Sequence, residues 1–276
     1  MTAPMTSSSA SMRDAVLAVV REARAAVPRL ALASAEEKNA ALRAMGGRLR
    51  TDRNAILSAN ARDVEVGRAA RLSAALIDRL TLTDQRLDEM IRSVEAVIEL
   101  PDPVGAVIRE WTRPNGLVIQ KVRVPLGVVG MIFESRPNVA SECGSLCVKS
   151  GNAVVLRGGA EAFRSNQAIT ASLRRALQDT GLPEAAVSTL PTADRAAVDV
   201  MLQLHDLIDV IIPRGGEALI RKVVETSRIP VIKHAKGVCH VYVDDAADLE
   251  MAQAIVLNAK CQRPATCNAM ETLLVH

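Results

Sequence analysis

The first hundred residues repeat their hydrophobic positions with the spacing of a helix. Between Met12 and Val27, the apolar residues fall on one helical face. Ser34 followed by Glu37 forms a capping box and predicts a second helix that continues to about Arg62. Two further helices are predicted at 72–79 and 83–100, the latter ended by the prolines at 101 and 103.

From residue 116 the pattern changes to that of strands. Residues 116–124 alternate apolar and polar side chains, as a half-buried strand does, whereas residues 127–133 are continuously apolar, as expected for a strand covered on both faces. Further strands are predicted at 153–157, 207–213, 230–233, 240–243 and 270–276, and helices at 139–150, 161–179, 217–227 and 249–259. This alternation predicts an α/β fold, a doubly wound, mostly parallel sheet preceded by a helical N-terminal portion.

The composition excludes several classes of protein. The chain has 276 residues, a net charge of +3 without any basic stripe, and only 1% aromatic residues, so it lacks the platforms on which nucleic-acid bases stack. Its N-terminal residues show no secretory signal, and no apolar run approaches the ~20 residues that span a bilayer. Five cysteines, odd in number and without a CxxC pair, indicate reduced thiols. We expect a cytoplasmic protein that binds neither nucleic acid nor membrane.

Two predicted strands end in the same Arg-Gly-Gly turn before a helix. The turns are Arg157-Gly158-Gly159 and Arg214-Gly215-Gly216. Glycines let a ligand approach the backbone, and the following helix N-terminus offers free N–H groups to a phosphate. Neither turn matches the G-x-G-x-x-G fingerprint of dehydrogenases. Two interpretations stay open, a dinucleotide site and a pair of tight turns.

Cys267 is the cysteine whose sequence neighbours favour a chemical role. It lies in a polar loop close to Lys260 and Arg263, and nearby cationic groups lower the pKa of a thiol. Spacing alone leaves open a nucleophile and a structural free cysteine.

Three other cysteines fit a buried, structural role. Cys143 and Cys147 share one face of a predicted helix, and Cys239 lies between two predicted strands. With His234 and His240, Cys239 matches no zinc spacing, so no metal site is predicted.

The loop NAKCQRPATCNAMET, residues 258–272, resembles the active-site loop of the γ-glutamyl phosphate reductases (glutamate-5-semialdehyde dehydrogenases) of the aldehyde dehydrogenase superfamily. The resemblance extends over nearly the whole chain from about residue 13. Other matching stretches are PLGVVGMIFESRPNV at 125–139, KSGNAVVLRGG at 149–159, IIPRGG at 211–216 and PVIKHAKG at 230–237.

The resemblance implies a reaction in proline biosynthesis, the NADPH-dependent reduction of L-glutamyl 5-phosphate to L-glutamate 5-semialdehyde and phosphate. Cys267 would be the nucleophile that forms a thioester, and Asn138 and the Cys267 N–H would stabilise the oxyanion. Arg136 and Arg263 would hold the substrate's phosphate or carboxylate, with structural salt bridges as the alternative. Residues 233–236 lack the glutamate that hydrolyses thioesters elsewhere in the superfamily, which argues against an aldehyde-oxidising enzyme.

The resemblance also implies a cofactor, NADPH/NADP, and partners. The cofactor-binding candidates are Lys149, Arg157 and Glu161 near the adenosine end, Gly158 and Gly159 in the first turn, and Gly215 and Gly216 beside the pyrophosphate. Glutamate 5-kinase is a candidate partner, and the full-length enzyme is expected to be a homo-oligomer.

Members of this family continue well beyond residue 276. We therefore expect a C-terminally truncated chain, with a disordered tail at 1–11, an NADP-binding domain at 12–257 and the start of a largely missing catalytic domain at 258–276. Its catalysis is expected to be absent or very weak. Two alternatives stay open, an inactive NADP-binding module and another acyl-reducing enzyme of the superfamily, such as one that reduces acyl-CoA.

Overall fold

The computed structural model describes residues 7–233, 237–262, 264, 266 and 268–276, with backbone only for 7–10. The chain forms two compact units, Met1–Lys233 and His234–His276. The predicted domain boundary between residues 257 and 258 falls inside a helix of the second unit. The functions assigned to those predicted domains stay predictions.

A four-stranded parallel sheet is the centre of the first unit, with the strand order β5-β4-β3-β6. Every residue of β3 is buried, as the continuous apolar run predicts. The strands are β3 (Val128–Phe133), β4 (Ala153–Arg157), β5 (Val187–Thr189) and β6 (Val210–Arg214). The predicted parallel α/β sheet is confirmed.

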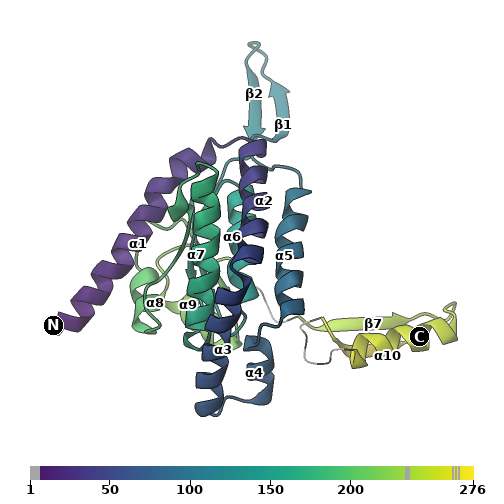
Figure 1. The fold of residues 1–276 in the computed structure, drawn as a ribbon. Helices are drawn as coiled ribbons and strands as arrows, with labels where there is room; N and C mark the ends of the chain where they lie inside the picture. Colours follow the sequence, from purple (N-terminus) through teal and green to yellow (C-terminus); the bar gives the residue numbers. More distant parts are fainter. Residues whose placement is uncertain (1–6, 234–236, 263, 265, 267) are drawn as a thin grey trace. The chain divides into compact units, whose positions relative to one another are not determined.

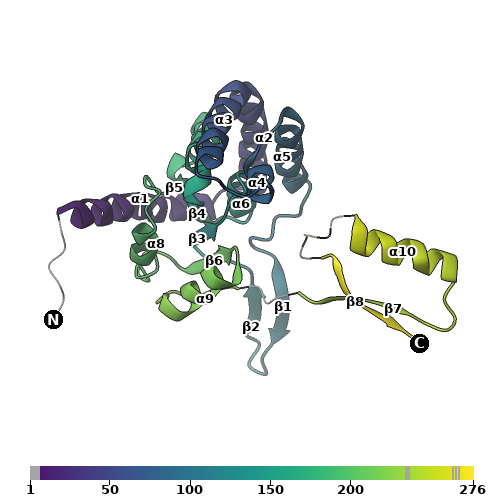
Figure 2. The same ribbon diagram turned by 90° about the horizontal axis from the view of Figure 1, so that it is seen from below.

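Helices cover both faces of this sheet, on either side of β3, β4 and β6 in Figure 2. Alternate residues of β3 enter different cores, since Val129 and Met131 pack into one cluster and Val128 and Ile132 into the other. The first cluster lies under α2 (Ala35–Thr51), α5 (Asp84–Ile98), α6 (Asn138–Lys149) and α7 (Phe163–Asp179), and the second under α1 (Ser7–Ala31), α8 (Ala196–Met201) and α9 (Glu217–Thr226). The sheet is doubly wound, as predicted.

The N-terminal helices differ from the prediction in two places. The single helix predicted from Ser34 to Arg62 is wrong, because the backbone leaves the helical conformation at Asp52 (φ −88°, ψ 7°). Two helices result, α2 and α3 (Arg53–Ala69), followed by α4 (Ala74–Leu80). Helix α1 begins at Ser7, so the second half of the segment predicted as disordered is helical.

An antiparallel hairpin connects α5 to the sheet, and Figure 1 shows it extending beyond the helices of this unit. It consists of β1 (Val107–Thr112) and β2 (Val118–Val122), and most of its residues are exposed. The alternation in β2 predicted a half-buried strand, which is wrong because no second layer covers the hairpin among the described residues. Elements β1, β5 and α8 have no counterpart among those predicted from the sequence, and the strand predicted at 230–233 is a single bridge between Ile211 and Val231.

The second unit consists of β7 (Cys239–Val243), α10 (Leu249–Cys261) and β8 (Met270–Val275). The two strands pair in parallel, and Figure 2 shows α10 beside them. Asp248 caps α10 by accepting a hydrogen bond from the Met251 N–H at 2.9 Å. The unit is a small βαβ arrangement.

Helices long and apolar enough to cross a membrane are absent from the described parts of both units.

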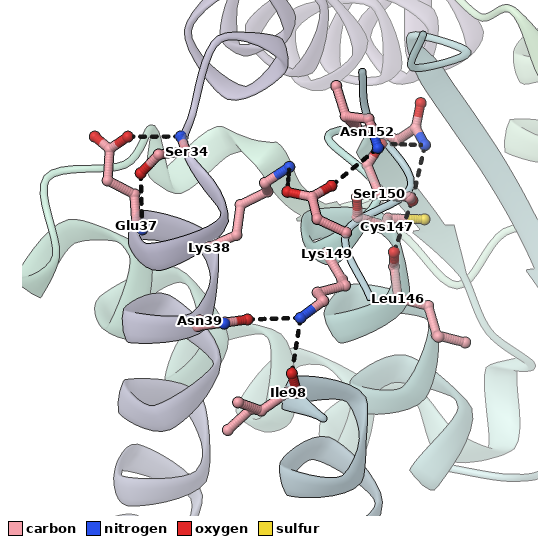
Figure 3. A network of polar contacts seen from close by, with 12 residues as sticks. Ser34, Glu37, Lys38, Asn39, Ile98, Leu146, Cys147, Lys149, Ser150 and Asn152 are labelled. Carbon is pink, nitrogen blue, oxygen red and sulfur yellow. Dashed lines mark hydrogen bonds and ion pairs between the residues drawn. The ribbon is translucent and has the colours of Figure 1, made fainter. Parts of the chain in front are cut away.

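A buried ion pair joins α2 to the segment that leads from α5 into the hairpin. Lys38 Nζ of α2 lies 2.5 Å from Asp102 Oδ2, and these side chains are 1% and 17% exposed. The other Asp102 oxygen accepts a hydrogen bond from the Val104 N–H at 3.0 Å. Figure 3 shows Lys38 and, near it, Lys149, whose Nζ donates to groups of α2 and α5.

Replacing Asp102 by alanine is expected to lower the free energy of unfolding by about 3–5 kcal/mol, because the Lys38 ammonium stays buried without a counter-charge. The double variant Lys38→Met/Asp102→Ala is expected to lose much less, since both charges are removed together. Urea unfolding followed by circular dichroism measures the difference.

The matched control is Arg221→Met, which breaks the Arg221–Glu217 pair, whose side chains are 66% and 81% exposed. This exposed pair is expected to contribute at most about 1 kcal/mol. Equal losses for Asp102→Ala and the control would contradict the importance of the buried pair.

Candidate functional site

The carboxyl ends of β3, β4 and β6 lie side by side, because the three strands pair in parallel. In this register, Ile132 lies opposite Arg157, and Phe133 lies opposite Arg214. The two Arg-Gly-Gly turns therefore flank the segment Glu134–Asn138 that follows β3. Ligands of open α/β sheets bind at such an edge, so this is the candidate site.

Glu134 is a member of this edge that sequence analysis missed. Its Oε2 accepts a hydrogen bond from the Gly216 N–H at 2.9 Å, and Gly216 is the N-cap residue of α9. A Cβ on Gly215 would lie 2.6 Å from Glu134 Cδ, so a side chain at 215 would displace the carboxylate from this position. The predicted pyrophosphate position thus already binds an oxyanion, one supplied by the chain. The available sequence signal was an acidic residue directly after the central strand.

Glu161, two residues after the other Arg-Gly-Gly turn, contacts the segment that follows β3. Its Oε1 accepts hydrogen bonds from the Ser135 N–H at 2.9 Å and from Ser135 Oγ at 2.6 Å. A Cβ on Gly159 would lie 2.1 Å from this same oxygen. The carboxylate predicted to meet adenosine is therefore directed at Ser135.

Arg157 is buried at the end of β4 and binds main-chain carbonyls. Its Nη1 donates to the Gly158 carbonyl at 2.8 Å, and its Nη2 donates to the Ala193 carbonyl at 3.0 Å. Burial lowers the pKa of the Arg157 guanidinium, while the Glu161 carboxylate opposes this shift. The side chain joins the Arg-Gly-Gly turn to the loop after β5 and is not free to face a cofactor phosphate.

The two predicted substrate residues of the first unit lie on the same segment. Arg136 is exposed, and within the described parts of the chain no carboxylate pairs with it. Asn138 is the first residue of α6, and its Nδ2 donates to Glu142 Oε1 at 2.7 Å. Arg136 is thus available for an anion, whereas the Asn138 amide has an internal partner.

Lys149 is not brought to this edge. It is the last residue of α6, at the opposite end of that helix from Asn138. Its Nζ donates to Asn39 Oδ1 at 2.6 Å and to the Ile98 carbonyl at 2.8 Å, as Figure 3 shows. Burial lowers the pKa of the Lys149 ammonium. The side chain joins α2, α5 and α6 and is remote from the predicted adenosine site.

The loop between α10 and β8 contains the predicted nucleophile. Cys267 and Arg263 lie outside the described residues, so their predicted roles stay predictions. Lys260 Nζ donates to the Met270 carbonyl at 3.0 Å and so joins the end of α10 to the start of β8. A hollow next to this loop is lined by Asn258, Ala259, Gln262, Thr266, Asn268 and Ala269.

Two other cysteines have the buried setting that the sequence predicted. Cys147 is buried and Cys143 is partly buried, and burial raises the pKa of Cys143 to about 12 and that of Cys147 further. Cys261 is exposed, and Cys239 is intermediate. Clusters of three His, Cys, Asp or Glu side chains that fit a metal ion are absent among the described residues.

Comparisons with known proteins agree with this architecture. The aldehyde dehydrogenase family model matches residues 2–276. A gamma-glutamyl phosphate reductase of Moorella thermoacetica is 54% identical over 93% of this chain and 61% of its own length. The crystal structure of gamma-glutamyl phosphate reductase from Thermotoga maritima superposes with a TM-score of 0.90 at 46% identity, over 95% of this chain and 64% of that one.

More distant structures share the fold alone. A propionaldehyde dehydrogenase of Rhodopseudomonas palustris with bound CoA is 18% identical, with a TM-score of 0.67 over 94% of this chain and 56% of that one. The chain spans about three fifths of the length of the curated relatives that it matches. It belongs to the aldehyde dehydrogenase family, and within that family it is similar to the γ-glutamyl phosphate reductases.

Proposed function

We propose that the chain belongs to an enzyme that reduces L-glutamyl 5-phosphate to L-glutamate 5-semialdehyde with release of phosphate. The observation that carries this proposal is the 54% identity to a protein named gamma-glutamyl phosphate reductase over 93% of the chain. The matched part includes the loop with Cys267 and both Arg-Gly-Gly turns.

The proposed first step is acyl transfer to Cys267. The thiolate attacks the acyl carbon, a carbon–sulfur bond forms, the carbon–oxygen bond to the phosphate breaks, and phosphate leaves with the electron pair. Asn138 is the proposed side-chain donor to the oxyanion. To donate to it, the Asn138 amide would give up its hydrogen bond to the Glu142 carboxylate. Arg136 and Arg263 are the proposed groups for the phosphate or carboxylate of the substrate.

The proposed cofactor is NADP(H), which supplies a hydride when bound. The edge around β6 fits a dinucleotide in one respect, since the Gly216 N–H already binds an oxyanion. An incoming pyrophosphate would replace the exposed Glu134 carboxylate there, and Gly215 leaves room for it. Arg157 and Lys149 have internal partners and would support the fold around the cofactor rather than contact it.

Two alternatives make different predictions. An acyl-CoA-reducing enzyme of the same family would form the Cys267 thioester from acyl-CoA and not from glutamyl phosphate. A non-catalytic NADP-binding module would bind the cofactor without forming a thioester. We expect a cytoplasmic enzyme that is a homo-oligomer at full length, with glutamate 5-kinase as a candidate supplier of the unstable acyl phosphate.

Incubation of the chain with chemically generated glutamyl phosphate is expected to leave a glutamyl thioester on Cys267 and to release up to one equivalent of phosphate above the protein-free reaction. The first step needs no hydride, so a single turnover is detectable even where steady-state catalysis is very weak. Peptide mass spectrometry locates the adduct, and hydroxylamine removes it.

Cys267→Ala is expected to reduce this burst of phosphate at least about a hundredfold, and Cys261→Ala, which changes the other cysteine of the loop, is expected to retain it. Phosphate release above the protein-free rate that does not depend on Cys267 would refute the proposed mechanism. An adduct formed only from acyl-CoA would favour the first alternative.

Alkylation by iodoacetamide between pH 6 and 9 is expected to modify Cys267 at a lower pH than Cys261, because a nucleophilic thiol has a pKa below the ordinary value of about 8.5. Cys143 and Cys147 are expected to stay unmodified in the folded chain, since burial raises the pKa of both thiols. Peptide mass spectrometry follows each site separately. Equal pH profiles for Cys267 and Cys261 would favour the non-catalytic module.

A further inference from the structure

Ser135, the second residue after the central strand, has an unusual backbone conformation. Its φ of 42° lies in the left-handed region, which residues other than glycine rarely adopt. Ser135 is buried, whereas Glu134 and Arg136 on either side of it are exposed. The conformation of this residue therefore sets the direction in which two exposed charged groups leave the sheet.

One carboxylate oxygen holds Ser135 in this conformation. Glu161 Oε1 accepts both the Ser135 N–H at 2.9 Å and Ser135 Oγ at 2.6 Å. Hydrogen bonds to an ionised acceptor are the stronger kind, and two of them on one residue can offset the cost of a left-handed backbone. Gly159 leaves room for this oxygen, since a Cβ there would lie only 2.1 Å away.

We propose that Glu161 is a positioning residue, which acts through Ser135 and fixes the direction of Glu134 and Arg136 at the candidate site. The inference rests on the proposed function, because the effect is on binding of the proposed cofactor. It differs from the role expected from family resemblance, in which Glu161 itself meets the adenosine end. In the structure, Glu161 Oε1 accepts both hydrogen bonds from Ser135.

The connection continues to the other turn. Glu134 precedes Ser135, and its carboxylate binds the N–H of Gly216. The Glu134 N–H in turn donates to the Arg214 carbonyl at 3.2 Å. Releasing Ser135 from Glu161 is thus expected to disturb the N-terminus of α9, where the pyrophosphate is proposed to bind.

The test is a set of variants of the whole chain whose affinity for NADPH is measured by calorimetry. Glu161→Ala is expected to weaken binding about tenfold, since it removes the support of a left-handed residue. Glu161→Gln is expected to stay within about threefold of the parent, because its amide oxygen still accepts both hydrogen bonds. Glu225→Ala, at an exposed position of α9, is the control and is expected to leave the affinity for NADPH unchanged.

The decisive variant is Ser135→Gly in the Glu161→Ala background. Glycine adopts positive φ readily, so it is expected to restore most of the lost affinity without any contribution from Glu161. If Glu161 contacted the nucleotide directly, the double variant would bind as weakly as Glu161→Ala or more weakly. That result would overturn the inference.

A second measurement does not need the cofactor. The backbone chemical shifts of residues 134–136 are expected to change in Glu161→Ala and to stay close to the parent in Glu161→Gln. Unchanged shifts in Glu161→Ala would overturn the inference whether or not NADPH binds. A parent chain that does not bind NADPH, with shifts that change as expected, would refute the proposed cofactor and support the role of Glu161 on Ser135.

Discussion

The parallel pairing of β3 with β4 on one side and β6 on the other is the constraint on which the candidate site depends. It places the ends of three strands at one edge, so that two Arg-Gly-Gly turns flank the segment after β3. The pairing is stabilised by burial, because alternate residues of β3 enter two different hydrophobic clusters. A shift of register by one residue would exchange these two sets and separate the turns.

Two carboxylates organise the edge that this pairing creates. Glu134 binds the first turn of α9, and Glu161 binds the backbone that follows β3. Both lie where glycine leaves room for them. The glycines of the two turns therefore have a structural reason in this chain, the close approach of a side-chain carboxylate, in addition to the approach of a ligand. Arg136 and Arg214 are exposed cations at this edge.

The sequence predicted the sheet well because short apolar runs such as those of β3 and β4 are typical of strands covered on both faces. The prediction of helices and strands failed where the local hydrophobic pattern does not distinguish one element from two, or where a strand is very short. The break at Asp52 interrupts one amphipathic stretch, and β5 has only three residues.

Among the site residues, the glycine turns follow from local sequence, but the position of Lys149 depends on Asn39, which is distant along the chain. The bond between Glu161 and Ser135 likewise joins two separate turns. Hydrogen bonds between polar groups that are distant along the chain cannot be recognised in a single sequence.

A crystal structure of the chain with NADPH would test the central claim, that the edge beside β3 is a dinucleotide site organised by these carboxylates. The account predicts the pyrophosphate at the Gly216 N–H, Glu134 displaced from it, and Glu161 still bonded to Ser135. NADPH bound away from the ends of β3 and β6, or Glu161 on the ribose hydroxyls with Ser135 released, would contradict it.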